Sequence, residues 1–475
     1  MSNMGLIKFN IIQETKIINN INQFGLIKRI EDTYKNRLYY LKESKVYVIW
    51  TGEYWAKCDN IELIRMVMDV INKIPNEINN VIGVAKTENG DMVTAKDLKK
   101  FQKSVSSDTA IKPAISLLPT CKNLVASESD FDTVTDHIVT QNGILNLRTG
   151  ILEDHNPEFK STKIAPVPYI KNADCPKFKK FIYEIFMGNE ELIKYIQVLL
   201  GYLITGLTIE QKIFIFRGYG SNGKSKLVNI LRKVLGDYAI DTPSSTFLKK
   251  PSNSIPSDLP RLKDARVIFA SESNLGQIFD MAIIKLCTGS DMVTARNLFE
   301  SFYSFTLQAK VVFITNIVPE IKSFDYGSLR RIEIIPFDRK FKDEEDNKYI
   351  EDELTKELTG IFAWIVEGAT QYLEKGLPKC DAVQKSTTNY LTKVDIIQDF
   401  LNDCCEINIE DKNYRISVAD LKNLFEIWAK KNGVDGYSKI KLSDLMELKG
   451  FEQGHSGSVR QWKGISIKSK LHSKP

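Results

Sequence analysis

The spacing of hydrophobic residues along this chain switches between strand-like and helix-like periods, and this predicts an α/β protein. A helix is expected after the first of four short apolar runs, with apolar residues at Leu227, Ile230, Leu231 and Leu235. A further single helix is expected over Glu351–Leu373. Along the chain the expected elements follow the order strand–helix–strand–strand–strand. This order predicts a doubly wound α/β domain that binds its ligand at the carboxyl ends of its strands. The four runs, each long enough for one buried strand, are Ile213–Phe216, Arg266–Ala270, Lys310–Thr315 and Ile332–Phe337.

Both sides of this domain carry their own elements. Alternating residues predict hairpins over Leu38–Trp55 and His137–Leu152. The stretch Asp241–Pro260, rich in Ser, Pro and Asn, is expected to be exposed and mobile. A β-like wing is expected over Ser458–Ile467. Helical spacing is found over Ile61–Ile74, Lys96–Ser106, Lys177–Phe186, Glu190–Leu203, Asp395–Cys404, Ser417–Lys431 and Lys441–Leu448.

Composition narrows the class of protein only modestly. At 475 residues the chain is expected to form about three domains. A hydrophobic fraction of 43% and a charged fraction of 26% are typical of a soluble globular protein. Seven cysteines form no C-x-x-C pair, which favours a reducing cytoplasm, and Cys404 and Cys405 are expected on a buried helix face. The longest apolar stretch, Ile196–Leu207, is too short for a membrane span.

One motif carries most of the chemistry. The residues from Gly218 to Ser225 match G-x-x-x-x-G-K-[ST] at every fixed position, between an expected strand and an expected helix. In that context the loop glycines allow the backbone to wrap around a polyphosphate. Lys224 would reach the β- and γ-phosphates, and the Ser225 hydroxyl would ligate Mg²⁺. The alternative is a glycine turn that happens to precede a helix. The motif reads Gly218, Tyr219, Gly220, Ser221, Asn222, Gly223, Lys224 and Ser225.

Polar residues end the next two strands. Glu272 follows the strand Arg266–Ala270 and is expected to activate the attacking water and to approach the Mg²⁺ ion, unless it is merely a solvent-facing residue. Asn316 ends the strand Lys310–Thr315, where an amide would hold that water and sense the γ-phosphate. The site would therefore combine Lys224, Glu272 and Asn316.

Two other groups are open to more than one interpretation. Asp130, Asp132, Asp136 and His137 could form a metal-dependent polymerase or primase site, but the run is more typical of turns before a strand. From His455 to the end there is no Asp or Glu, and the basic residues there suit a helix-turn-helix relative that docks on duplex DNA. A solvated tail on an oligomerisation domain is the alternative.

In combination, these motifs resemble those of the superfamily-3 helicases, in the primase–helicase branch of phages, plasmids and poxviruses. GYGSNGKS resembles the family's phosphate loop, RLKDARVIFASES its acidic motif with Glu272, and KVVFITNIVPEI its sensor with Asn316. IKLCTGSDMVTAR, at Ile284–Arg296, resembles the motif between the two. SLRRIEIIPF resembles the segment with the arginine finger, which implies that Arg330 or Arg331 reaches the γ-phosphate of the next subunit.

The resemblance also implies a domain plan. It comprises an extension over 1–24, an α+β helicase-associated domain over 25–205, an AAA+-like P-loop ATPase core over 206–378 and a winged-helix-like DNA-binding domain over 379–475. YLKESKVYVIWTGEYW and FDTVTDHIVTQNGILNLRTGILEDH resemble the N-terminal domain. No polymerase-like primase module is recognisable, so no primase activity is expected.

The DNA-contacting hairpin of the family would fall near Asn297–Phe305, where relatives often carry a lysine and this chain has none. Other side chains would then have to make the contacts. The candidates are Lys285, Arg296, Phe302 and Tyr303 in the core, and Arg460 and Lys463 in the wing.

The function implied is an ATP-dependent, Mg²⁺-requiring replicative DNA helicase and replication initiator of a mobile genetic element. It would form a homohexameric ring, translocate 3′ to 5′, and act on single-stranded, forked and duplex origin DNA, beside a separate primase and away from membranes. The alternative is an ATP-binding origin-recognition or regulatory protein without processive unwinding. A P-loop kinase would leave Thr288–Arg296 unexplained.

Overall fold

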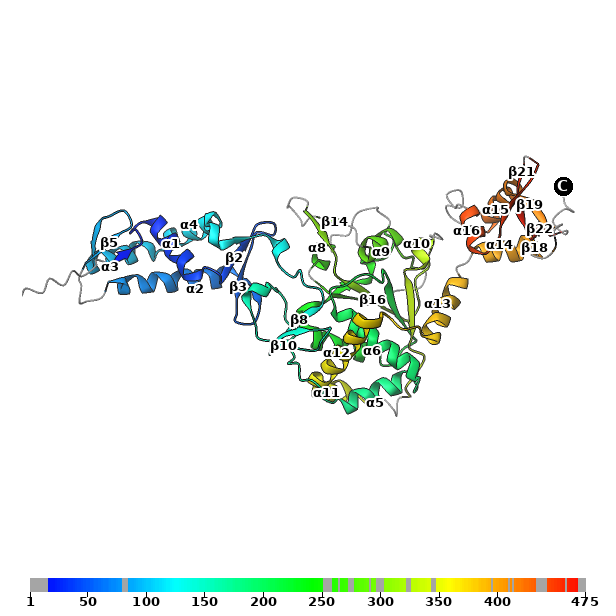
Figure 1. Cartoon of the computed structure of the whole chain (residues 1–475), viewed down its shortest axis with the longest axis horizontal. Coiled ribbons are helices and arrows are strands. Elements are labelled where there is room, and N and C mark those ends of the chain that lie inside the picture. Colours follow the sequence, from blue (N-terminus) through cyan, green and yellow to red (C-terminus); the bar gives the residue numbers. More distant parts are fainter. Residues whose placement is uncertain are drawn as a thin grey trace, which may run out of the picture. The chain divides into compact units, whose positions relative to one another are not determined.

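The chain contains helices and several sheets, as the α/β pattern predicted (Figure 1). The computed structural model describes residues 16–78, 84–250, 259–263, 265–271, 277–289, 292–295, 303–321, 326–342, 347–393, 396–408, 411, 414–432, 442–457 and 459–468. It divides into two compact units, Met1–Val134 with Asp154–Ile164, and Thr135–Glu153 with Ala165–Pro475. Within the described part, no helix is both long and apolar enough to span a bilayer.

The first unit packs four helices against small sheets. The hairpin expected over Leu38–Trp55 is present, and it gains a third strand because Trp55 pairs with Trp50. The helices are α1 (Gln23–Tyr34), α2 (Asn60–Lys73), α3 (Ala95–Val105) and α4 (Asp108–Leu117). One sheet has the order β4-β3-β2-β7, from Trp55–Cys58, Val46–Trp50, Leu38–Leu41 and Val125–Ala126; the other is β1-β5-β6, from Ile17–Ile18, Val84–Thr87 and Met92–Thr94.

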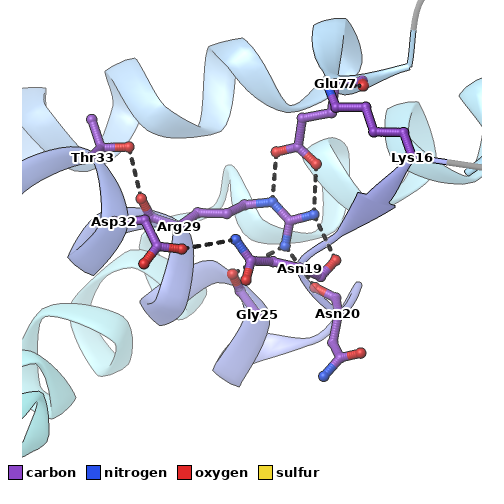
Figure 2. Close-up of polar contacts among 8 residues, drawn as sticks. All are labelled: Lys16, Asn19, Asn20, Gly25, Arg29, Asp32, Thr33 and Glu77. Carbon is purple, nitrogen blue, oxygen red and sulfur yellow. Dashed lines mark hydrogen bonds and ion pairs between the residues drawn. The ribbon is translucent and has the colours of Figure 1, made fainter. Parts of the chain in front are cut away.

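A buried arginine holds the start of this unit in place. The Arg29 guanidinium donates to the carbonyl oxygens of Asn19 at 2.8 Å and Asn20 at 2.7 Å, and forms two bonds of 2.7 Å with the Glu77 carboxylate (Figure 2). Arg29 is only 4% exposed, so its charge needs these partners. Gly25 lies in the first turn of α1, and a Cβ atom there would lie 1.7 Å from the Asn20 carbonyl oxygen, which explains why this position requires a glycine.

The second unit is organised around a five-stranded parallel sheet in the order β12-β13-β16-β11-β17. Four of its strands are the four predicted apolar runs, now seen as β11 (Ile213–Arg217), β13 (Val267–Ser271), β16 (Lys310–Thr315) and β17 (Ile332–Pro336). A hairpin of β8 (His137–Thr140) and β9 (Gly143–Asn146), joined by β10 (Leu152–Glu153), confirms the second expected hairpin.

The fifth strand, β12 (Ala239–Pro243), corrects an expectation. Its last three residues are the first three of the stretch Asp241–Pro260, which was expected to be exposed and mobile. The strand nevertheless pairs along its length with β13. Thr246 and Phe247, just beyond it, are buried. As an edge strand β12 is only partly covered, so it lacks the continuous apolar run that identified the other four. Residues 251–258 lie outside the described part.

Helices cover both faces of this sheet. The side chains of β11 alternate between two cores, because Phe214 and Phe216 belong to one core and Ile213 and Ile215 belong to the other. The first core is closed by five helices. They are α5 (Pro176–Ile185), α6 (Glu190–Ile204), α7 (Lys224–Leu235), α11 (Ile350–Thr355) and α12 (Leu358–Lys375). Figure 1 labels α5, α6, α11 and α12 together below the sheet. The second core contains α8 (Leu259–Leu262) and α9 (Met281–Thr288), with α10 (Tyr326–Leu329) against α9.

The single helix expected over Glu351–Leu373 is wrong, because the chain breaks between α11 and α12. Glu357 stands at the break, and its carboxylate accepts the backbone N–H groups of Lys177 at 3.2 Å and Phe178 at 3.0 Å. These are free donors at the start of α5, where a carboxylate is favourable. The break therefore caps a neighbouring helix, which periodicity alone does not reveal.

A C-terminal group of elements has its own core around Phe400, Phe425 and Trp462. Cys404 ends α14 and Cys405 begins β18, so the pair is buried as expected but does not share a helix face. The elements are α14 (Ile396–Cys404), α15 (Val418–Lys431), α16 (Leu442–Leu448), the pair β18 (Cys405–Ile407) with β22 (Ile465–Ile467), and a sheet of β19 (Arg415–Ser417), β21 (Val459–Lys463) and β20 (Gln453–Ser456). These helices match the predicted ones.

The helix α13 (Asp381–Lys393) precedes this group but packs on the large sheet. The Ile334 N–H of the edge strand β17 donates to the Thr387 hydroxyl at 2.9 Å. The Tyr390 hydroxyl also donates to the Pro319 carbonyl. Any excision of the C-terminal elements should therefore begin beyond α13.

Two glycines let α6 and α12 approach at backbone contact. A Cβ atom at Gly368 would lie 2.0 Å from the Gln197 carbonyl oxygen, and one at Gly201 would lie 2.0 Å from the Ala369 nitrogen. The buried Gln197 side chain then donates to the Trp364 carbonyl at 3.0 Å. We call this contact the glycine seam, and it fixes the helical layer that supports the phosphate loop.

We predict that Gly368→Ala destabilises the second unit by about 3 kcal/mol, because backbone atoms cannot move aside as a flexible side chain can. The measurement is thermal unfolding of the full chain followed by tryptophan fluorescence. Glu374→Ala, an exposed change on the same helix, is the matched control. Equal unfolding profiles for the two variants would contradict the seam.

Candidate functional site

The predicted phosphate loop joins β11 to α7 at the carboxyl edge of the parallel sheet. Its backbone takes positive φ at Ser221 (49°) and at Gly223 (82°). A Cβ atom at Gly223 would lie 2.5 Å from Ile185 of α5, whereas one at Gly220 would meet nothing within 4 Å. The loop is therefore packed tightly on one side and open at Gly220. Such a loop before a helix N-terminus offers backbone N–H groups to an anion.

The loop is held by the segment that follows β17. The Asn222 side-chain amide donates to the Phe337 carbonyl at 3.2 Å, and the Phe341 N–H donates to the Ser221 carbonyl at 2.8 Å. Asn222 is 3% exposed, so this amide is a fixed part of the loop. These bonds set the loop conformation before any ligand binds.

Lys224 and Asn316, predicted from separate motifs, lie together. The Lys224 ammonium donates to the Gly218 carbonyl and lies 3.4 Å from the Asn316 side-chain oxygen. This is possible because β11 and β16 are neighbours, so their carboxyl ends meet. Lys224 is 5% exposed, and its burial lowers the pKa of its ammonium to about 8.

Around these residues lies a pocket of about 990 Å³. The loop residues from Gly220 to Ser225 line it, with Asn316 and Thr315 at the end of β16. Ser225 is exposed to the pocket. Gly218 and Tyr219 belong to the loop but do not line the pocket, and the Tyr219 side chain is 71% exposed.

One wall of the pocket was not anticipated from the sequence. Lys177, Lys180, Phe181 and Glu184 of α5 line it, at the i, i+3, i+4, i+7 spacing of one helix face. Phe341, Asn347, Ile350 and Glu353 also line the pocket. The helical spacing of α5 was visible in the sequence, but nothing local shows that this face turns toward the loop.

The two adjacent arginines have different surroundings. Arg331 is half-buried, and its Nε donates to the Thr288 hydroxyl at 3.1 Å. Arg330 is exposed and donates to the Gln211 side-chain oxygen at 2.5 Å. Both precede β17, whose first residue Ile332 pairs with Ile213, so they lie at the amino edge of the sheet, opposite the phosphate loop.

Several predicted site residues lie elsewhere or cannot be placed. Glu272, Arg296 and Phe302 lie outside the described residues. Lys285 is on α9. Tyr303 begins β15 (Tyr303–Thr306), which pairs with β14 (Met292–Ala295) as an antiparallel hairpin.

In the C-terminal elements, Arg460 and Lys463 are both exposed on β21. Lys463 has an ion-pair partner, Glu452, at 3.5 Å. The DNA-contact candidates thus belong to at least two separate structural elements.

The acidic run near residue 130 forms turns, as the simpler interpretation predicted. The Asp132 carboxylate accepts from the Thr162 backbone N–H at 3.0 Å and the Lys163 ammonium at 2.6 Å. Asp136 instead contacts His137 at 2.8 Å and Arg148 at 3.2 Å. Each carboxylate has its own structural partners.

Comparison with known proteins shows what the chain resembles. Residues 28–187 match the family model described as "D5 N terminal like". A protein of Acanthamoeba polyphaga mimivirus named "putative helicase" is 26% identical over 412 residues, covering 80% of this chain and 42% of that protein. A second "putative helicase", of Invertebrate iridescent virus 6, is 23% identical and covers 76% of this chain and 41% of its own length. The chain thus spans about two fifths of the length of these relatives.

In sequence the chain is thus similar to viral proteins named as helicases, and its residues 28–187 resemble the D5 N-terminal family. The matched N-terminal stretch contains the two sequence blocks that resembled this family, and the relatives extend the similarity across most of the chain. Among solved structures, the apo C-terminal region of NrS-1 is similar at 12% identity and a TM-score of 0.48, covering 93% of this chain and 99% of that one.

The buried Lys224 predicts a pH dependence for polyphosphate binding, with ATP as the probe. Its pKa near 8 lies below the usual 10.5, so the ammonium loses its proton as pH rises through 8. Above that pH, binding must take up a proton, and the affinity should fall by up to about tenfold per pH unit. Calorimetric titrations between pH 7 and 9.5 measure this.

Lys224→Arg is the control, because a guanidinium keeps its charge throughout this range. Its affinity should be lower but nearly constant with pH. If the two proteins show the same pH profile, Lys224 does not carry the effect.

Proposed function

We propose that this chain is an ATP-dependent DNA helicase that acts in DNA replication, with an AAA+-like P-loop core. The observation that carries the proposal is the meeting of Lys224 and Asn316 in one pocket at the carboxyl edge of a parallel sheet. A cation for the phosphates and an amide for the attacking water are what nucleotide hydrolysis requires there. The names of the viral relatives favour a helicase over other nucleotide hydrolases.

Mg²⁺ fits the same site through the hydroxyl of Ser225, an exposed residue that lines the pocket next to Lys224. A hard oxygen ligand of this kind is the type that Mg²⁺ prefers. When bound, the ion neutralises charge on the β- and γ-phosphate oxygens. Glu272 follows Ser271, which lines the pocket at the end of β13, and we assign it the role of general base from its sequence position.

Arg330 is the better candidate for the arginine finger. It is exposed at the edge of the sheet opposite its own phosphate loop, so it would act on a neighbouring subunit in a homohexameric ring. Arg331 is half-buried against Thr288 and Gly327, which favours a packing role. Both residues lie in the turn between α10 and β17, so the division follows from their different surroundings and not from the alternation of a strand.

DNA would be contacted by two parts of the chain. The β14–β15 hairpin fits a ring-lining element for single-stranded DNA, near Lys285, Arg296, Phe302 and Tyr303. The C-terminal elements combine three helices with a small sheet, and we assign them as a winged-helix-like module for duplex origin DNA. The proposal also includes translocation in the 3′ to 5′ direction, replication of a mobile genetic element, a separate primase and a cytoplasmic location. All seven cysteines are free thiols, which suits that setting.

The deciding experiment measures ATP turnover with and without single-stranded DNA, and strand separation on a forked substrate. A helicase should show strong stimulation and ATP-dependent unwinding. An origin-recognition or regulatory protein would bind ATP and duplex DNA but separate no strands. In the helicase, Lys224→Ala should abolish turnover, since alanine removes the phosphate-binding charge.

The shared active site predicts complementation between two inactive proteins. Arg330→Ala should lower ATP turnover on the order of a thousandfold, as expected for a finger. Mixed with Lys224→Ala protein, it should regain part of the activity, because some intact loops then face intact fingers. Arg331→Ala is the comparison and should lower thermal stability more than turnover in folded protein.

Recovery must be tested after mass photometry has shown that both proteins enter the same ring. If Arg330→Ala and Arg331→Ala both fail to recover in such mixed rings, the shared-site mechanism is wrong.

The C-terminal module predicts a change in salt dependence. Arg460→Ala should weaken duplex DNA binding and reduce the slope of log affinity against log salt by about one, the loss of one phosphate contact. Lys422→Ala, an exposed change on α15, is the matched control. Equal slopes for wild type, Arg460→Ala and Lys422→Ala would show that this surface does not touch DNA.

A further inference from the structure

The pocket extends well beyond the phosphate loop, and the following inference rests on the proposed ATP site. Its volume of about 990 Å³ is at the upper end of ordinary ligand pockets, so a phosphate chain occupies only part of it. We call the part of the pocket lining that lies outside the loop the outer part, and it includes Lys177 and Lys180 of α5 together with Phe341 and Ile350. These residues are not part of the phosphate-loop motif.

Phe341 is fixed directly beside the loop. Its backbone N–H donates to the Ser221 carbonyl at 2.8 Å, so its position follows that of the loop. Its side chain is half-buried, lines the pocket and packs against the same core as Ile350. The Arg339 guanidinium carbon lies 5.1 Å from the centre of the Phe341 ring and covers one of its faces, so a base would stack on the other. Stacking on such a ring suits any heterocyclic base, because every base has a π-face.

The outer rim of the pocket is polar and internally linked. The Glu353 carboxylate forms an ion pair of 2.8 Å with the Lys177 ammonium and accepts from the Asn347 amide at 3.1 Å. The pair joins α5 to α11. A carboxylate with two partners still has lone pairs for a further donor, such as a base amino group or a ribose hydroxyl.

We propose that the base and ribose of the bound nucleoside triphosphate occupy this outer part of the pocket. The base stacks on Phe341, and the linked side chains of Lys177, Asn347 and Glu353 border its polar edge. The phosphate loop then supplies the charge recognition, whereas Phe341 supplies the affinity that distinguishes a nucleotide from a bare polyphosphate.

The test compares two ligands on the full chain by calorimetry, ATP and inorganic tripolyphosphate. Phe341→Ala should weaken ATP binding roughly tenfold or more, the usual effect of losing one base stack, and leave tripolyphosphate affinity unchanged. Phe341→Leu keeps an apolar side chain and should lose affinity for ATP in the same way, whereas Phe341→Tyr should retain it. Tyr183→Ala is the control, because Tyr183 is an aromatic residue of α5 that is 58% exposed and does not line the pocket.

The outcomes separate this inference from the function on which it rests. If wild-type protein binds neither ligand, the proposed ATP site itself is wrong. If it binds ATP no more tightly than tripolyphosphate, the phosphate site stands and the base subsite is wrong. The subsite is also wrong if Phe341→Ala weakens both ligands equally, since the ring would then act only by holding the loop, or if it weakens neither.

Discussion

Two buried cations connect the helical layer to the sheet, and the position of the site depends on them. The Arg266 guanidinium donates to the Ile204 carbonyl at 2.7 Å, and the Lys310 ammonium donates to the Thr205 carbonyl. These carbonyls belong to the last turn of α6 and the residue after it, where a helix has unpaired acceptors and a partial negative charge. Lys310 is only 2% exposed, and burial, followed by the nearby Arg266, lowers its pKa well below the usual value. Losing either carbonyl would therefore leave a buried cation with fewer partners to compensate its charge.

Because Arg266 precedes β13 and Lys310 begins β16, this contact locks α6 to the amino ends of the two central strands. The glycine seam then places α12 on α6, and Glu357, at the head of α12, caps α5. Through Ile185, α5 in turn packs against Gly223 of the phosphate loop. The phosphate loop, at the carboxyl edge of the sheet, is thus supported by successive contacts through α6, α12 and α5. These contacts begin at the amino edge of the sheet.

The sequence allowed the prediction of those features that depend on local pattern. Fully buried parallel strands are continuous apolar runs, so four of the five strands of the sheet were predicted from the sequence. The phosphate loop was predicted because phosphate binding requires its glycines and Lys224 at fixed positions. Features that depend on a distant partner were not predicted. The edge strand β12 is ordered by pairing with β13, the break before α12 exists because Glu357 caps another helix, and the pocket-facing side of α5 is defined only by packing. The division of labour between Arg330 and Arg331 likewise required their surroundings, Gln211 and Thr288.

The strand β17 has a special position in this arrangement. At its carboxyl end, Phe337 accepts the Asn222 amide and Phe341 donates to Ser221, so the segment after β17 holds the phosphate loop. At its amino end stands Arg330. A strand of five residues is stiff and spans only about 17 Å. A displacement of the loop on binding or losing a phosphate would reach the residues that hold it, and then the strand that carries the arginine. In a ring built as proposed, the same strand would connect the nucleotide of one subunit with the finger acting on the next, so neighbouring sites would be coupled through a single rigid element rather than through a long path of side chains.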